Sequence, residues 1–145
     1  MVEYKLVIGQ KEGKTIQQQV KDTQADVLHG KRLGETVSGD ALGFAGYEFL
    51  ITGGSDKCGF PMRKGIQDPR KVIMIGKGVG FCGKKRKLGK KTTRKTQNGL
   101  LRRRTVCGER ITKIIRQVNL KVTKVGAKPL GEVDAPAEAS SEKKE

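Results

Sequence analysis

The sequence predicts a mainly β protein: a small β-barrel with one short helix, a basic extended arm, a C-terminal strand and a disordered acidic tail. Three observations carry this prediction. Short β-forming runs with alternating apolar residues are separated by turn residues. The 20 glycines among 145 residues are about twice the usual share and suit tight turns. Positive charge is concentrated in one internal stretch. A chain of this length forms one domain, or a small domain with extensions.

The first twenty residues are expected to form a hairpin. Alternate residues at the start are apolar and would share the buried face of a strand: Val2, Tyr4, Leu6 and Ile8. Ile16 and Val20 continue the alternation after a loop over residues 9–13, which predicts the second strand. From residue 22 the pattern changes. Thr23 is a suitable capping residue for a short helix of two to three turns that ends at Gly30 or Gly34.

The middle of the chain predicts three further strands. Residues 35–37 form a short one, a turn follows at 38–40, and residues 47–52 form a strongly β-forming run with Tyr47, Phe49 and Ile51 on one face. Residues 72–75 are all apolar, which is typical of a strand buried on both faces.

The segment after residue 104 supports two interpretations. Residues 105–107 resemble a short strand, but from Ile111 to Val125 both a helical and a strand period fit the apolar residues. Because the second half is β-branched and stops at Gly126, we expect a helical turn at residues 112–116 and a strand over 118–125. The composition beyond residue 128 offers little to bury, which predicts a disordered tail.

Residues 84–104 contain eleven basic side chains in twenty-one positions and no Asp or Glu. Self-repulsion should keep this arm extended until a polyanion neutralises it. The predicted organisation is therefore a β-barrel body over residues 1–82, a basic RNA-binding arm over 83–104, a C-terminal β segment over 105–128 that packs on the body, and the tail over 129–145.

The charge distribution points to a polyanionic partner. Residues 1–56 carry a net charge of −2, residues 57–128 carry +21, and the rest carry −3. The longest apolar run, residues 72–75, is far too short to span a bilayer, so a membrane is not expected. The N-terminal residues lack the apolar core of a signal peptide, which predicts a cytoplasmic protein and removes heparin from the candidates. RNA or DNA is left.

Catalysis, metals and cofactors are not expected. The three cysteines, Cys58, Cys82 and Cys107, are odd in number and far apart, which favours free thiols over disulfides. With one histidine and no Cys-x-x-Cys, a zinc site is not indicated. The acids have no obvious nucleophile or metal-binding histidine beside them, so they are interpreted as solvated or turn-forming groups.

Residues 78–83 match the pattern G-x-G-x-x-G after a predicted strand, yet their context argues against nucleotide binding. The dinucleotide fingerprint needs an acid about twenty positions on, and the phosphate loop needs Ser or Thr where Lys85 stands. Backbone that approaches RNA phosphates closely is the better account of these glycines.

The most specific motif is Ile51-Thr52-Gly53-Gly54-Ser55-Asp56-Lys57-Cys58-Gly59-Phe60-Pro61-Met62. Its paired glycines allow backbone conformations closed to other residues, and Asp56 can tighten a turn by bonding to its own backbone. This block resembles the signature of the S-six-e family of small-subunit ribosomal proteins of archaea and eukaryotes. The order and spacing of residues 40–43, 76–78, 103–108 and 118–122 are similar to that family as well, so the resemblance covers residues 1–128.

The resemblance implies a β-barrel-like structural constituent of the small ribosomal subunit that binds ribosomal RNA, lies among neighbouring ribosomal proteins, stays in the cytoplasm on the ribosome and has no small-molecule substrate. The short acidic tail replaces the long basic helix of eukaryotic members and indicates an archaeal type. The alternative is a free-standing β-barrel RNA-binding or translation factor. The residues expected to bind RNA are all basic: Arg63, Lys64, Lys77, Lys84, Lys85, Arg86, Lys87, Lys90, Lys91, Arg94, Lys95, Arg102, Arg103 and Arg104.

Overall fold

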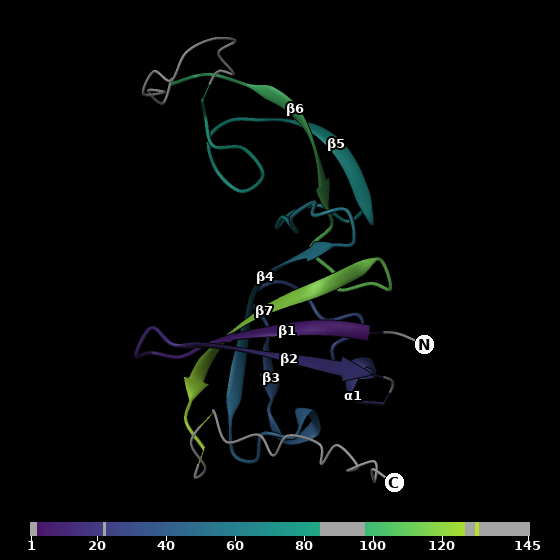
Figure 1. The fold of residues 1–145 in the computed structure, drawn as a ribbon. Helices are drawn as coiled ribbons and strands as arrows, with labels where there is room; N and C mark the ends of the chain where they lie inside the picture. Colours follow the sequence, from purple (N-terminus) through teal and green to yellow (C-terminus); the bar gives the residue numbers. More distant parts are fainter. Residues whose placement is uncertain (1–2, 22, 85–97, 127–129, 131–145) are drawn as a thin grey trace, which may run out of the picture.

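The computed structural model describes residues 3–21, 23–84, 98–126 and 130. Within these ranges the chain forms a curled five-stranded sheet and, projecting from one end of it, a two-stranded antiparallel ribbon. Figure 1 shows the sheet in the lower half and the ribbon above it. The predicted mainly β fold with one short helix is confirmed.

The N-terminal hairpin is confirmed, and it places a C-terminal strand beside it. Strands β1 (Glu3–Gly9) and β2 (Thr15–Lys21) pair antiparallel, with Leu6 opposite Gln18. Strand β7 (Ile115–Lys124) lies parallel to β1 on its other side, with Leu6 opposite Val118. The strand expected over residues 118–125 therefore begins earlier and occupies the centre of the sheet.

The other half of the sheet is built on β4 (Glu48–Asp56), which pairs antiparallel with β7 and with the short β3 (Thr36–Ser38). The strand order is β2-β1-β7-β4-β3. Tyr47, Phe49 and Ile51 are all buried, as their alternation predicts. The turn after β3 contains a 3₁₀ turn, η1 (Asp40–Leu42), which is held because Asp40 accepts hydrogen bonds from Ser38 Oγ at 2.8 Å and from Gly46 N at 2.7 Å.

The core fills the concave side of this sheet. Alternate side chains of β1, β4 and β7 contribute to one cluster of buried residues, and Phe44 and Tyr47 pack around Phe49 at ring-centroid distances of 5.6 and 5.9 Å. Aromatic contacts of this kind add stability beyond the area that they bury.

The helix is shorter than expected. Helix α1 (Thr23–Asp26) has four residues in place of two to three turns. The backbone that follows leaves the helix to bond elsewhere: Gly30 N donates to Ile111 O at 2.8 Å, and Gly30 has φ +82°. The turns that follow α1 thus end at Gly30, one of the two glycines expected to end the helix, where the backbone pairs with a residue more than 80 positions away.

The ribbon consists of β5 (Arg70–Ile75) and β6 (Arg102–Cys107), with Met74 opposite Arg103. The expectation that residues 72–75 are buried on both faces is wrong: Ile75 is buried, but Val72 and Met74 are 52% and 58% exposed. The described residues cover only one face of the ribbon, so alternate apolar side chains of β5 lie on an open face. The strand expected at 105–107 begins at Arg102, and the expected boundary between residues 104 and 105 lies inside β6.

Two other expectations concern the C-terminal part. The helical turn expected at 112–116 is a tight turn, closed by a hydrogen bond from Ile115 N to Thr112 O at 3.0 Å, directly before β7. The predicted tail at 129–145 lies outside the described residues except for Leu130. Within the described part of the chain, no helix is long and apolar enough to cross a membrane.

Candidate nucleic-acid interface

A buried carboxylate joins the sheet to the ribbon. Asp56 ends β4, Arg70 begins β5, and Cys107 ends β6. Asp56 Oδ2 accepts a hydrogen bond from Arg70 Nη2 and lies 3.4 Å from Cys107 Sγ, and Asp56 Oδ1 accepts from Phe60 N at 2.8 Å. The guanidinium of Arg70 also lies over the Phe60 ring, 5.2 Å from its centroid. One side chain thus fixes the ends of three strands.

The pKa values at this junction follow from its contacts. Burial alone would raise the pKa of Asp56, but the donors Phe60 N, Arg70 and Cys107 outweigh it and hold that pKa below its ordinary value. Burial raises the pKa of the Cys107 thiol to about 11, with the neighbouring Asp56 charge acting in the same direction. Asp56 is therefore charged at neutral pH, and Cys107 is an un-ionised thiol.

The motif at residues 51–62 builds this junction. Gly53 and Gly54 are expected from the sequence to adopt backbone conformations closed to other residues, but both lie within β4 and neither has a positive φ. Their small size matters for another reason: a Cβ on Gly54 would lie 2.5 Å from Gln117 O and 2.8 Å from Met62 Sδ. The turn comes later, and Asp56 closes it as expected through its hydrogen bond to Phe60 N at 2.8 Å.

A tight hairpin covers one face of the ribbon. Gly78 and Phe81 exchange two backbone hydrogen bonds, of 2.9 and 3.1 Å, and the turn between them contains Gly80 at φ +92°. Phe81 packs with Ile75 and Val106 in a second buried cluster. The G-x-G-x-x-G match therefore begins with a β turn whose aromatic residue anchors it to the ribbon.

Seven of the fourteen residues expected to bind RNA are in the described part of the chain. They all lie on the ribbon or its connecting loops: Arg63, Lys64, Lys77, Lys84, Arg102, Arg103 and Arg104. The other seven, between residues 85 and 95, lie outside the described residues: Lys85, Arg86, Lys87, Lys90, Lys91, Arg94 and Lys95. No ion pair with a carboxylate involves any of the first seven within the described ranges.

The three successive arginines face in two directions. Arg102 and Arg104 are opposite Ile75 and Ile73, on the face that Phe81 covers, and the Arg104 guanidinium lies 5.7 Å from the Phe81 ring centroid. Arg103 is opposite Met74 on the open face. A single straight phosphate backbone on one face of the ribbon would meet two of these guanidinium groups and miss the third.

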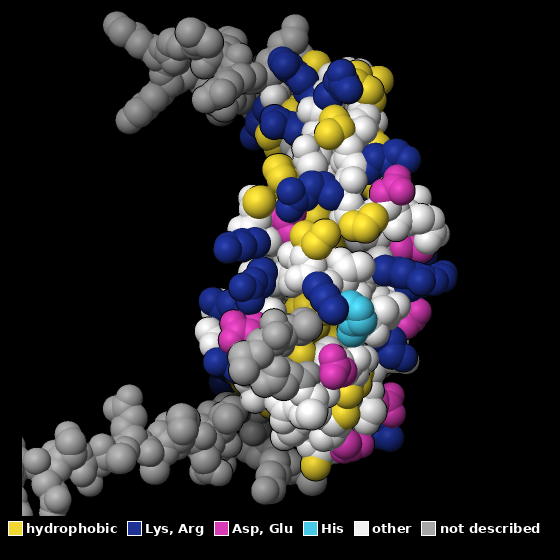
Figure 2. Space-filling model, turned by 90° about the vertical axis from the view of Figure 1, so that its right-hand side faces the viewer, with side chains coloured by type: hydrophobic (Ala, Val, Ile, Leu, Met, Phe, Trp, Pro, Cys, Tyr) yellow, Lys and Arg dark blue, Asp and Glu magenta, His cyan; other side chains and the backbone are white. Residues whose placement is uncertain are grey.

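The ribbon is the most cationic part of the described molecule. Figure 2 shows Lys and Arg side chains over the upper part of the molecule, where β5 and β6 lie in Figure 1, with hydrophobic side chains between them. Sequence reasoning missed two basic residues of β5. Arg70 pairs with Asp56, and Lys71 lies 2.8 Å from Asp68, so part of their charge is neutralised within the protein.

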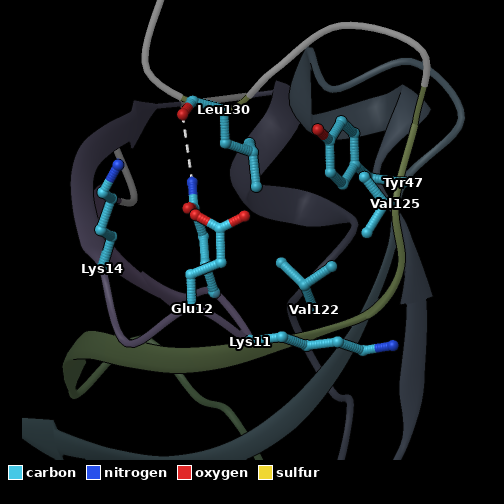
Figure 3. Close-up of a pocket in the computed structure, with 8 residues that line it drawn as sticks. Lys11, Glu12, Lys14, Tyr47, Val122, Val125 and Leu130 are labelled. Atoms are coloured by element: carbon cyan, nitrogen blue, oxygen red, sulfur yellow. Dashed lines mark hydrogen bonds between the residues drawn. The ribbon is translucent and has the colours of Figure 1, made fainter.

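A different pocket lies at the far end of the sheet from the ribbon. It has a volume of about 280 Å³ and is lined by the β1–β2 loop, the end of β7 and Tyr47. In Figure 3 the side chain of Leu130 extends toward the space between that loop and Tyr47, and Gln10 Nε2 donates to Leu130 O at 3.1 Å. This contact returns the chain after β7 to the sheet, and it adds no positive surface to the ribbon.

Comparison with known proteins identifies the family. Residues 4–135 match the family model described as Ribosomal protein S6e. A protein of Methanospirillum hungatei named small ribosomal subunit protein eS6 is 40% identical over 141 residues, covering 95% of each chain. Proteins of the same name from Methanoculleus marisnigri and Methanosphaera stadtmanae are 36% identical, covering 98% and 96% of this chain and 100% and 98% of their own. The chain belongs to the Ribosomal protein S6e family, as its sequence motifs indicate.

Proposed function

We propose that the chain is a structural constituent of the small ribosomal subunit, located with the ribosome in the cytoplasm, and that it binds ribosomal RNA through the ribbon and the basic segment that connects its strands. The observation that carries the proposal is the group of seven described cations on the ribbon and its loops, none of which has a carboxylate partner in the described chain. Unpaired cations of this kind bind phosphates by displacing condensed counterions.

The names of the relatives support the first part of the proposal, since each is called a small ribosomal subunit protein. The family also favours a structural role over catalysis. Neighbouring ribosomal proteins are expected partners, and the exposed Val72 and Met74 on the open face of the ribbon would suit such a contact.

The ribbon arginines provide the direct test of RNA binding. Changing Arg102, Arg103 and Arg104 together to Ala should weaken affinity for small-subunit ribosomal RNA and flatten the dependence of affinity on salt, by about one unit of slope for each phosphate that the variant no longer neutralises. The matched control ends the chain after Leu130, which removes a segment of net charge −3 and should leave affinity equal or slightly higher. A triple variant with the parent slope would contradict the proposal.

A different experiment distinguishes an integral protein of the small subunit from the alternative, a free-standing RNA-binding or translation factor. A tagged copy expressed in an archaeal host should sediment with small subunits after a wash at high salt. A factor would be released by that wash, because its binding would depend on fewer contacts.

A further inference from the structure

A cationic pocket lies beside the junction of sheet and ribbon. It has a volume of about 470 Å³ and is lined by seven residues from four separate segments: Glu3, Lys57, Cys58, Arg70, Lys113, Ile114 and Arg116. Four of the seven are basic and one is acidic. We call it the neck pocket. Nothing in the sequence indicates that its four cations bind RNA, because they are spread over sixty positions and do not form a cluster.

The two arginines of the neck pocket are held in place by the protein. Arg70 forms an ion pair with Asp56, and its guanidinium group lies over the Phe60 ring. Arg116 Nη1 lies 3.4 Å from Glu3 Oε2, and Glu3 also pairs with Lys21 at 3.3 Å. A guanidinium has five N–H donors, so both groups keep donors that their carboxylate partners do not use. Each carboxylate partner therefore favours one orientation of its guanidinium group before any ligand arrives.

The two lysines supply charge that the protein does not neutralise. Lys57 and Lys113 are exposed, and neither has an ion pair within the described part of the chain. Ile114, 41% exposed, adds an apolar edge to the same hollow. Fixed guanidinium groups, mobile ammonium groups and an apolar edge are together suited to a phosphate with its sugar, and the volume lies within the range of about 300 to 1,000 Å³ typical of small-ligand sites.

We propose that the neck pocket binds a phosphodiester of the RNA backbone, and that it anchors the RNA on the body of the protein independently of the ribbon arginines. The inference rests on the proposed RNA-binding function and adds a second contact to it. Because Arg70 belongs both to the neck pocket and to the junction, a phosphate bound here would contact the side chain that pairs with Asp56, the residue that joins ribbon and sheet.

The test compares two double variants of equal charge change. Lys57→Ala with Lys113→Ala removes the free ammonium groups of the neck pocket, whereas Lys11→Ala with Lys14→Ala removes two exposed lysines from the loop at the opposite end of β1. With small-subunit ribosomal RNA, the first pair should lower the slope of log affinity against log salt by about one to two units. The second pair should keep the parent slope. Arginine at both neck positions should restore it.

Cys58 provides a second measurement, because its exposed thiol lines the neck pocket. In a Cys82→Ser background, bound RNA should slow the alkylation of Cys58 by N-ethylmaleimide at least several-fold. This protection should disappear in the Lys57→Ala, Lys113→Ala variant even when RNA is saturating. Inorganic phosphate at about 10 mM should not protect.

The outcomes separate the two proposals. If the parent fails to bind RNA, the proposed function itself fails. If the parent binds but both double variants have the same slope, or Cys58 stays protected in the neck variant, the neck pocket is not an RNA contact. Equal protection by inorganic phosphate would overturn the claim for a backbone site and indicate a general anion site.

Discussion

Replacing Asp56 by Asn should destabilise the protein although the two side chains have nearly the same shape. Asn can still accept the hydrogen bond from Phe60 N, which is 2.8 Å long with Asp. It cannot carry the negative charge that Arg70 faces, and its amide group would point N–H donors at the donors of Arg70 and Cys107. The change therefore isolates the charge of Asp56 from its role in the turn.

The magnitude follows from the interactions that the substitution removes. A hydrogen bond to a charged group contributes about 1.5–3 kcal/mol, and the 39% exposure of the Arg70 side chain lets water screen part of it. We expect the free energy of unfolding to fall by about 2 kcal/mol for Asp56→Asn. Asp56→Ala also leaves Phe60 N–H without its acceptor and should lower the free energy of unfolding by about 3 kcal/mol or more. Urea unfolding measures both; with a slope of about 2 kcal/mol per M, the first change moves the midpoint by about 1 M.

Asp40→Asn is the matched control, since Asp40 also accepts hydrogen bonds in a turn but is exposed and has no cation beside it among the described residues. Its midpoint should stay close to that of the parent. The pair can be checked further with a double-mutant cycle of Asp56→Asn and Arg70→Ala, which should be non-additive. The reasoning is refuted if Asp56→Asn unfolds at the parent midpoint, or if the cycle is additive.

The same residue gives a dependence on pH. Because the folded protein holds the pKa of Asp56 below its ordinary value, the carboxylate stabilises the fold above the unfolded pKa of about 3.9. This contribution is lost as the pH falls through the folded pKa. The stability difference between the parent and Asp56→Asn should thus be full at pH 7 and shrink below about pH 4. A difference that stays constant from pH 7 to pH 3 would contradict the shift.

Two other predictions follow from the junction. Gly54→Ala should destabilise the protein by about 1–3 kcal/mol in urea unfolding, because its Cβ would lie 2.5 Å from the backbone oxygen of Gln117; Gly53→Ala, whose Cβ would lie 3.7 Å from its nearest neighbour, should cost less, and equal costs would argue against the steric explanation. At pH 8, iodoacetamide should modify the exposed Cys58 and Cys82 while Cys107 reacts only on unfolding, because burial raises the pKa of the Cys107 thiol to about 11. Mass spectrometry of the native protein measures this, and prompt modification of Cys107 would show that the junction opens.

Local periodicity predicted those elements whose pattern is set within a few residues. The β1–β2 hairpin and the buried face of β4 both appear where alternation places them. It could not predict the parallel pairing of β1 with β7, because nothing in either strand specifies a partner more than 100 residues away. The same limit applies after α1, because the bond from Gly30 N to Ile111 O is also to a distant residue.

The residues 72–75 show a different limit. An unbroken apolar run is typical of a strand covered on both faces, but it cannot tell how many layers will cover it. Among the described residues, Phe81, Ile66 and Leu100 pack on the face of the ribbon that contains Ile75, so Ile75 is buried while Met74 on the other face is exposed. Val72 and Met74 are apolar residues that the described core does not use. Exposed apolar residues of this kind mark a face that suits contact with a partner.

The candidate site was predicted from charge density, and charge density identifies only the cations that are neighbours in sequence. The cations of the neck pocket come from β5, from the loop after β4 and from residues 113–116. The pairing of β4 with β7 and the contact of Arg70 with Asp56 bring them together. The seven described cations of the ribbon and its loops have no carboxylate partner in the described part of the chain. The neck cations differ because Arg70 and Arg116 each have a carboxylate partner that orients them.

Unpaired cations contribute affinity that salt removes, whereas oriented guanidinium groups determine where along the backbone the phosphate sits. If this division holds, substitutions on the ribbon should lower affinity without moving the protein along the RNA, and substitutions in the neck pocket should shift or broaden its footprint.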